Sequence, residues 1–335
     1  MTVRIGLIGA GGMGRAHVDR IANVLAGAKV VAIADINEDG AKAVAEPLGA
    51  KAYTSGPELI NDPDVDAVLI ATFGNVHVND LLACIEAGKP VLCEKPMVTT
   101  ADDAIKVMEA EQKAGKKLVT VGFMRRFDAS YREMKATFDA GEHGDALLVH
   151  CRHRNPLIPV PYYTTENMLD DTSIHEFDIC RFLLGEEITR IRVDVPKHSK
   201  NAREDLQDPL VWVGYTESGT RIDSEVNVNC QFGYSIECEL VMESGTVLLG
   251  DQEKTHVRDT RGHRNAMAQS HIDRFEAAFN TEVQEWIRAV ENCEHTGPTA
   301  WDGYAAVTVV DASLAALADG QEHEITQIEK PDFYA

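Results

Sequence analysis

The sequence has little of what marks membrane, secreted or nucleic-acid-binding proteins. No apolar run reaches the roughly 18 residues that a membrane span needs, and the glycines near the N-terminus arrive too early for a signal peptide. The seven cysteines show no C-x-x-C spacing, which disfavours a disulfide framework or structural zinc and is typical of a reducing cytoplasm. Only 32 Lys and Arg stand against 54 Asp and Glu, and the net charge of −22 disfavours nucleic acid and anionic membranes as partners.

The first part of the chain alternates short apolar stretches with helical patterns. The expected strands are residues 3–8, 29–35, 65–72, 90–94 and 117–123. Strands that alternate with helices of this length predict an α/β fold with a doubly wound parallel sheet. We therefore expect a dinucleotide-binding (Rossmann) domain at residues 1–122.

The remaining residues, 123–335, have a different pattern. Six stretches between 146 and 251 alternate apolar and polar residues and are joined by Glu, Ser and Gly turns, so we expect consecutive antiparallel strands. Helices are expected at 128–140, 173–184, 273–293 and 302–318. This pattern predicts an α+β domain with a large, mostly antiparallel open sheet. One face of such a sheet would stay wet in a monomer, which favours a homo-oligomer.

A glycine-rich motif follows the first expected strand. Gly9, Gly11 and Gly14 form G-x-G-x-x-G and open a helix, which is the setting of a dinucleotide-binding turn. Asp35 ends the second strand, where a carboxylate binds ribose hydroxyls and repels a 2′-phosphate, and Ile36 follows without a neighbouring arginine. The motif predicts NAD rather than NADP, while a glycine-rich turn without a ligand is the alternative. The expected contacts here are Gly9, Gly11, Gly12, Met13, Gly14, Asp35 and Ile36.

Two later strand ends carry polar side chains. Ligands bind at the carboxyl ends of strands in open parallel sheets, so Thr72, Phe73, Asn75 and His77 are expected cofactor contacts. Asn75 is also a good helix-capping residue, which is the structural alternative. Glu94 and Lys95 end the next strand before Pro96, so we expect Lys95 to lie near the nicotinamide.

A second constellation is the stretch NMLDDTSIHEFDICRFLLG. On a helix, Asp171, His175 and Asp178 fall at i, i+4 and i+7, which places them on one face. A carboxylate beside a histidine favours the imidazolium, as a general base requires. One alternative is a helix-capping aspartate together with a structural histidine, and Asp170 is an equal candidate for that cap. The other alternative is a metal site with His153 as a third ligand. The spacing does not support the metal, and we expect none.

These motifs together resemble the glucose–fructose oxidoreductase/inositol dehydrogenase family over nearly the whole chain. The resemblance rests on Gly9–Gly14, Asp35, EKP at 94–96, GFMRRFD at 122–128 and the Asp171/His175 pair. HCRHRNP, IHEFDICRFLLG and NCQFGYSIECELV further resemble the bacterial NAD-dependent inositol 2-dehydrogenase branch, which oxidises myo-inositol to the 2-keto sugar.

The resemblance implies site residues, a second-domain role and an assembly. It makes Lys95, Asp171 and His175 the catalytic group, and residues 123–335 a substrate-binding and oligomerisation domain of a homotetramer. It also implies a cis Lys95–Pro96 bond. Further polyol contacts would be Met124, Arg125, His153, Asn155, Asp178 and Tyr234.

The expected chemistry is hydride transfer from a small-molecule polyol. His175 would remove the hydroxyl proton, Asp171 would orient the ring, and Lys95 would donate a hydrogen bond to the same oxygen. Two other functions stay open: a dehydrogenase for another cyclic polyol or an aldose, and an NAD-binding sensor without turnover.

Overall fold

The computed structural model describes residues 2–158, 160–250 and 256–335, and these form two compact units. The first unit comprises Met1–Met124, Phe279–Val307 and Ile328–Ala335. The second unit comprises Arg125–Ala278 and Thr308–Gln327. The predicted second domain, residues 123–335, is therefore too long, because two late segments belong to the first unit.

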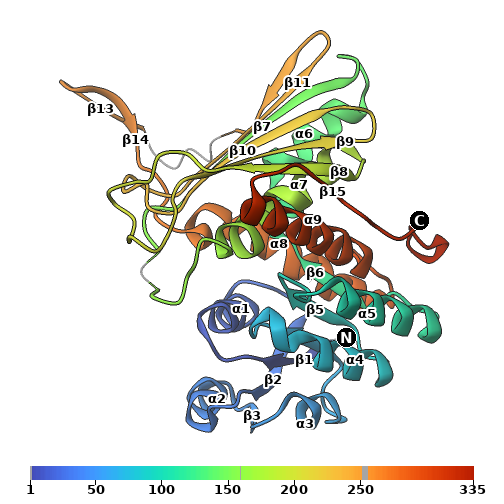
Figure 1. Ribbon diagram of the computed structural model, residues 1–335. Coiled ribbons are helices and arrows are strands. Elements are labelled where there is room, and N and C mark those ends of the chain that lie inside the picture. The colour runs from blue at the N-terminus through green and yellow to red at the C-terminus, as the bar shows by residue number, and fades with distance from the viewer. Residues whose placement is uncertain (1, 159, 251–255) are drawn as a thin grey trace. The chain divides into compact units, whose positions relative to one another are not determined.

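A six-stranded parallel sheet forms the centre of the first unit (Figure 1). Its order is β3-β2-β1-β4-β5-β6, which is the order of a Rossmann fold. The strands are β1 (Val3–Ile8), β2 (Ala28–Ala34), β3 (Lys51–Tyr53), β4 (Ala67–Ile70), β5 (Val91–Glu94) and β6 (Val119–Gly122). The predicted doubly wound parallel sheet is therefore confirmed.

Helices cover both faces of this sheet. They are α1 (Gly12–Asn23), α2 (Glu38–Ala45), α3 (Gly56–Ile60), α4 (His77–Glu86) and α5 (Ala101–Ala114). Thr100 caps α5 by accepting the Asp103 N–H, as predicted. Part of the long helix α8 (His271–Asn292) completes one face, because Val283, Trp286 and Ile287 are buried with the side chains of α1, α2 and β1. This apolar contact explains why Phe279–Val307 belongs to the first unit.

A seven-stranded sheet forms the centre of the second unit. Its order is β12-β11-β7-β10-β9-β8-β15. The strands are β7 (Ala146–Arg154), β8 (Ile188–Asp194), β9 (Leu210–Thr216), β10 (Arg221–Asn227), β11 (Ser235–Met242), β12 (Thr246–Leu248) and β15 (His323–Glu324). The mostly antiparallel sheet is confirmed, but the strands are not consecutive throughout, because β7 lies between β11 and β10 and pairs parallel with β10. Strand β15 and the hairpin of β13 (His256–Asp259) and β14 (Gly262–Asn265) were not predicted.

One face of this second sheet is covered by helix α7 (Ile174–Leu184), almost all of which is buried. Phe177 of α7 packs on Trp212 of β9 with ring centroids 4.9 Å apart. The unit also contains α6 (Ala129–Asp139) and part of α9 (Ala300–Asp319). In the part of the chain that the structure describes, no helix combines the length and apolar character needed to cross a membrane.

Candidate active site

The glycine-rich turn has the backbone geometry that its motif predicts. Gly9 has φ +102°, and a Cβ there would lie 2.6 Å from the Ala71 carbonyl oxygen. A Cβ at Gly14 would lie 1.9 Å from the Gly9 carbonyl oxygen, so only glycine lets this helix and turn approach so closely. A Cβ at Gly11 or Gly12 would meet nothing within 4 Å. Two glycines therefore serve the fold, and the other two leave the start of α1 open to a ligand.

Asp35 lies beside this turn at the end of β2. Its Oδ2 accepts the Ala10 N–H at 2.7 Å, and its Oδ1 accepts the Asn37 N–H at 2.8 Å. Ile36 is 97% exposed and Met13 is half-buried in the first turn of α1. The carboxylate thus holds the glycine-rich loop, and it remains half-exposed at the position expected for a ribose contact.

The loop after β4 carries four predicted contacts, three of which are accessible to different degrees. Phe73 is 73% exposed and Asn75 is exposed, while Thr72 is half-buried. The Thr72 Oγ1 atom is buried and has no hydrogen-bond partner among the described residues. Val76 is the N-cap residue of α4 and makes no side-chain bond, so Asn75 is not the cap.

His77, the fourth of these residues, is fully buried. Its Nε2 lies 3.1 Å from the Thr72 carbonyl oxygen, and its Nδ1 lies 2.9 Å from the Pro96 carbonyl oxygen. Burial lowers the pKa of the ring. These contacts join the loops after β4 and β5, and they argue for a positioning role rather than direct contact with a ligand.

Glu94 and Lys95 end β5. The Lys95–Pro96 peptide bond is cis, as the resemblance implied. Lys95 is half-buried, whereas Glu94 is buried and accepts a hydrogen bond from His17 Nε2 at 2.7 Å. Burial opposes ionisation of Glu94, but the hydrogen bond and charge of His17 together with Lys95 outweigh it, and the pKa of Glu94 is lowered. His17, which the sequence analysis did not select, thus supports a carboxylate next to the expected catalytic lysine.

In the second unit, Asp171 and His175 do not share one regular α-helix. Asp171 is exposed within a π-helix (Met168–Ser173), and His175 is buried at the second position of α7. The α-helical register predicted for the pair therefore does not extend back to Asp171. Ser173 is the N-cap residue of α7, so the alternative in which Asp170 or Asp171 caps this helix is wrong.

Glu176, the residue directly after His175, belongs to a buried ion pair. Arg125 Nη1 donates to Glu176 Oε1, and each of these two residues is only 1% exposed. Glu176 Oε2 lies 3.0 Å from His153 Nδ1, and Arg125 Nη2 lies 3.1 Å from the same atom. Glu176 was missed, because α7 also carries Asp178 and Arg181, so one further charged residue in this helix does not by itself indicate a buried partner.

Three of the predicted ring side chains come together in this unit. His153 Nε2 lies 3.3 Å from the Tyr234 hydroxyl, and the ring centroids of His153 and His175 are 6.4 Å apart. Burial raises the pKa of Tyr234 to about 12. Within residues 2–158, 160–250 and 256–335, no three His, Cys, Asp or Glu side chains are arranged to hold a metal ion.

The other predicted polyol contacts have different surroundings. Asp178 is buried and receives hydrogen bonds from Arg126 Nε at 2.9 Å and Arg126 Nη2 at 2.5 Å. Asn155, just after β7, is half-buried and its backbone N–H donates to the Asn227 carbonyl oxygen. Met124 is buried at the end of a segment of the first unit. Arg126 is therefore a further residue that the sequence analysis missed.

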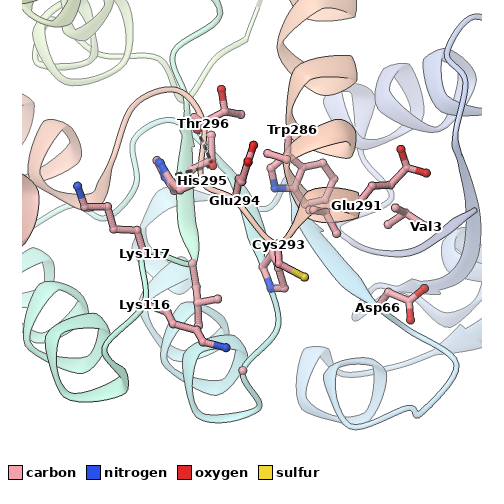
Figure 2. A pocket seen from close by; sticks show the side chains of 16 residues that line it. Val3, Asp66, Lys116, Lys117, Trp286, Glu291, Cys293, Glu294, His295 and Thr296 are labelled. Carbon is pink, nitrogen blue, oxygen red and sulfur yellow. Dashed lines mark hydrogen bonds between the residues drawn. The ribbon is translucent and has the colours of Figure 1, made fainter. Parts of the chain in front are cut away.

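A pocket of about 610 Å³ lies at the other end of the parallel sheet (Figure 2). It is lined by Val3, Asp66, Pro90 and Leu118, which begin or immediately precede strands, and by the end of α8 and the loop after it. The predicted cofactor residues lie at the carboxyl ends of the same strands. The pocket is therefore separate from the candidate active site.

Comparisons with known proteins agree with this architecture. Residues 3–123 match the family model described as an oxidoreductase family with an NAD-binding Rossmann fold, and residues 131–248 match the GFO/IDH/MocA C-terminal domain. Inositol 2-dehydrogenase 3 from Saccharopolyspora erythraea is 46% identical over 334 residues, which are 100% of this chain and 98% of that protein. The inositol 2-dehydrogenase of Azotobacter vinelandii is 43% identical over 337 residues, which are 100% and 99% of the two chains.

A solved structure is similar over the same length. The crystal structure of myo-inositol dehydrogenase from Lactobacillus casei in complex with NAD(H) and myo-inositol has a TM-score of 0.97 and 38% sequence identity, and the match covers 100% of both chains. The parallel sheet with its glycine-rich turn is thus an NAD-binding domain. The chain belongs to the GFO/IDH/MocA family of NAD-binding oxidoreductases.

Proposed function

We propose that the protein oxidises myo-inositol to 2-keto-myo-inositol (scyllo-inosose) with NAD. The observation that carries this proposal is the full-length similarity to a structure that binds both NAD(H) and myo-inositol. The site supports it, because hydrogen-bonding side chains suited to a polyol gather around His175 in the second unit.

The first unit fits a dinucleotide. Gly11 and Gly12 leave the start of α1 open, where backbone N–H groups bind phosphate. The Asp35 carboxylate lies beside this turn, where it can accept hydrogen bonds from ribose hydroxyls. The Thr72 hydroxyl, buried without a partner among the described residues, is also suited to a polar ligand. We assign cofactor binding to Gly9, Gly11, Gly12, Met13, Gly14, Asp35, Ile36, Thr72, Phe73, Asn75 and Lys95, with His77 and Glu94 supporting the loops. When bound, NAD supplies the hydride acceptor.

The protein must then remove one proton from the reacting hydroxyl. His175 is the proposed general base, since an unperturbed imidazole titrates near neutral pH. Asp171 stabilises the imidazolium that forms, and Lys95 donates a hydrogen bond to the developing alkoxide. These three roles rest on the family resemblance and on the chemistry of the side chains.

The rest of the polyol is held by hydrogen bonds. His153 and Tyr234 are locked by their mutual contact and by Glu176, so they present a preorganised pair of polar groups. Arg125 and Asp178 are already paired with Glu176 and Arg126, so we propose that they shape the pocket wall as much as they bind substrate. Met124 and Asn155 complete the proposed contacts.

The decisive experiment is an initial-rate panel of NAD and NADP against inositol isomers, glucose and xylose. We expect myo-inositol with NAD to have the highest kcat/KM, and Lys95→Ala and His175→Ala to abolish turnover. His198→Ala is the matched control, because His198 is an exposed histidine of the same unit as His175 that contacts the Arg203 carbonyl oxygen. NAD binding in calorimetry without turnover of any polyol or sugar would instead identify a sensor.

We also propose a homotetramer in a reducing cytoplasm. The side chains of β10 and β11 alternate between buried and half-exposed, and the half-exposed face carries cross-strand ion pairs such as Arg154–Glu225 and Arg152–Glu237. Such a face is suited to pairing with a second copy. All seven cysteines are free thiols, in keeping with a reducing compartment. Light scattering coupled to gel filtration tests the tetramer, and a monomer would contradict it.

A further inference from the structure

A chain of buried polar side chains connects α8 to the end of β5 within the first unit. Asn280 Oδ1 accepts from Arg20 Nε at 2.9 Å, and Arg20 Nη1 lies 2.8 Å from His17 Nδ1. His17 Nε2 lies 2.7 Å from Glu94 Oε1, and Glu94 Oε2 accepts the Lys95 N–H at 3.3 Å. His17 is 0% exposed, and Arg20 and Glu94 are buried. The reaction assigned above uses neither His17 nor Arg20.

The proton on His17 can be assigned from these contacts. A guanidinium is protonated at any working pH and has only donors, so Arg20 donates and His17 Nδ1 must accept. The remaining ring proton is then on Nε2, which faces the Glu94 carboxylate. Arg20 is itself held by Asn280 and stacks on the Phe279 ring at 5.0 Å, so it cannot easily turn away.

Glu94 connects these buried side chains to Lys95, the proposed reacting residue. The titratable groups that face it are His17 from α1 and Lys95 next in sequence, and it also acts on His77 of α4 and on the preceding Cys93. A Cβ on Gly122 of β6 would lie 3.2 Å from Glu94 Oε2, which is closer than an ordinary contact, so the neighbouring strand packs tightly against the carboxylate. The carboxylate is therefore closely packed, and its two oxygens are held by the His17 Nε2 proton and by the Lys95 N–H.

We propose that His17, with its Nε2 proton fixed by Arg20, is a positioning residue that holds Glu94 against the Lys95 backbone and thereby places the reacting lysine. This inference rests on the proposed function of Lys95. His17 lies on the helix that opens from the glycine-rich turn, so it ties the backbone at Lys95 to the helix expected to bind the pyrophosphate.

Three variants test this role. His17→Phe keeps the ring but loses both nitrogen contacts, and we expect kcat to fall about 10- to 100-fold, as for a misplaced reacting group. His17→Gln keeps a donor and an acceptor side by side and should restore most of the lost kcat. His295→Phe is the matched control, since His295 bonds the Val119 carbonyl oxygen at the opposite end of the sheet. It should change the thermal midpoint without changing kcat.

The pH profile separates positioning from mere stability. Without the Nε2–H donor, burial of Glu94 is less opposed, so the pKa of Glu94 rises and the carboxylate is lost at a higher pH. The acid limb of the kcat–pH profile should therefore move upward in His17→Phe and stay in place in His295→Phe. A His17→Phe enzyme with the kcat and pH profile of the control overturns the proposal, whatever its thermal midpoint.

A measurement on the wild-type protein does not depend on turnover. In ¹⁵N-histidine NMR, with His17→Gln to assign the signals, we expect a protonated Nε2 and an unprotonated Nδ1 for His17. A proton on Nδ1 overturns the proposal even in an active enzyme. Failure of the wild type to oxidise any polyol with NAD would refute the proposed function, while this NMR result would still decide the His17 assignment.

Discussion

The Arg125–Glu176 pair allows the sharpest test of the second unit. Both side chains are only 1% exposed, and Glu176 also faces His153 Nδ1 at 3.0 Å. Glu176→Gln keeps the shape of the side chain but leaves the Arg125 guanidinium without its counter-charge. A buried charge that has lost its partner is strongly destabilising, because its desolvation is no longer compensated.

The magnitude follows from this burial. Breaking one side of a fully buried pair costs about 3–5 kcal/mol of unfolding free energy. For a unit of this size, each kcal/mol lowers the melting temperature by roughly 2–4 °C, so we expect a drop on the order of 10 °C. The double variant Arg125→Met/Glu176→Gln should recover most of this loss, since no unpaired charge remains and the new amide oxygen can still accept a hydrogen bond from His153 Nδ1.

The measurement is a double-mutant cycle. Urea denaturation and calorimetry give the stability of the wild type, Arg125→Met, Glu176→Gln and the double variant. Glu38→Gln is the control, because its partner Lys42 forms an exposed pair, and no resolvable change is expected. Activity is a poor readout here, since Arg125 is also a proposed substrate contact. A double variant no more stable than Glu176→Gln alone would refute the view that an uncompensated charge causes the loss.

Three further predictions concern the first unit. Gly14→Ala should abolish NAD binding in calorimetry, because its Cβ would lie 1.9 Å from the Gly9 carbonyl oxygen, whereas Gly12→Ala, with nothing within 4 Å, should bind within about tenfold of wild type. Asp35→Ser should raise the NADP/NAD ratio of kcat/KM by about tenfold or more by removing a like charge, and an unchanged ratio would contradict that role. Hydrogen bonds from a tyrosine, a backbone N–H and a lysine lower the pKa of Asp62 to about 2. Ionised Asp62 therefore stabilises the fold above its ordinary pKa, and this stability is lost as the pH falls from about 4 to about 2. The loss of unfolding free energy over that range should be smaller in Asp62→Asn than in the wild type.

Local patterns predicted the first unit better than the second. Buried parallel strands and glycine-rich turns are specified by short stretches of sequence, and the backbone at Gly9 and Gly14 confirms them. Alternation also located the six main strands of the second sheet. It did not predict that β7 pairs parallel with β10, because strand order depends on contacts between distant segments. The same limit applies to α8, whose apolar face does not reveal which sheet it covers.

The site shows the same division. The structure brings the rings of His153, His175 and Tyr234 close together, while their role as polyol contacts stays a prediction. The partners that hold these groups were missed, since a buried ion pair such as Arg125–Glu176 joins residues 51 positions apart. The π-helix at Met168–Ser173 was also missed, because no simple periodicity distinguishes it from an α-helix.

The proposed reacting groups share one feature of local architecture. Lys95 directly follows buried Glu94, and His175 directly precedes buried Glu176. Adjacent residues point in different directions at a strand end or on a helix, so one short segment can present a reacting side chain and anchor itself through its neighbour. In each case the anchoring neighbour is a carboxylate that contacts a histidine. The carboxylate of Glu176 also contacts an arginine directly, whereas that of Glu94 is linked to an arginine through its histidine. Because each such carboxylate is buried, its loss must displace the adjoining backbone or leave a charge unpaired. Substitutions at these glutamates should therefore reduce kcat even though neither carboxylate is assigned a chemical step.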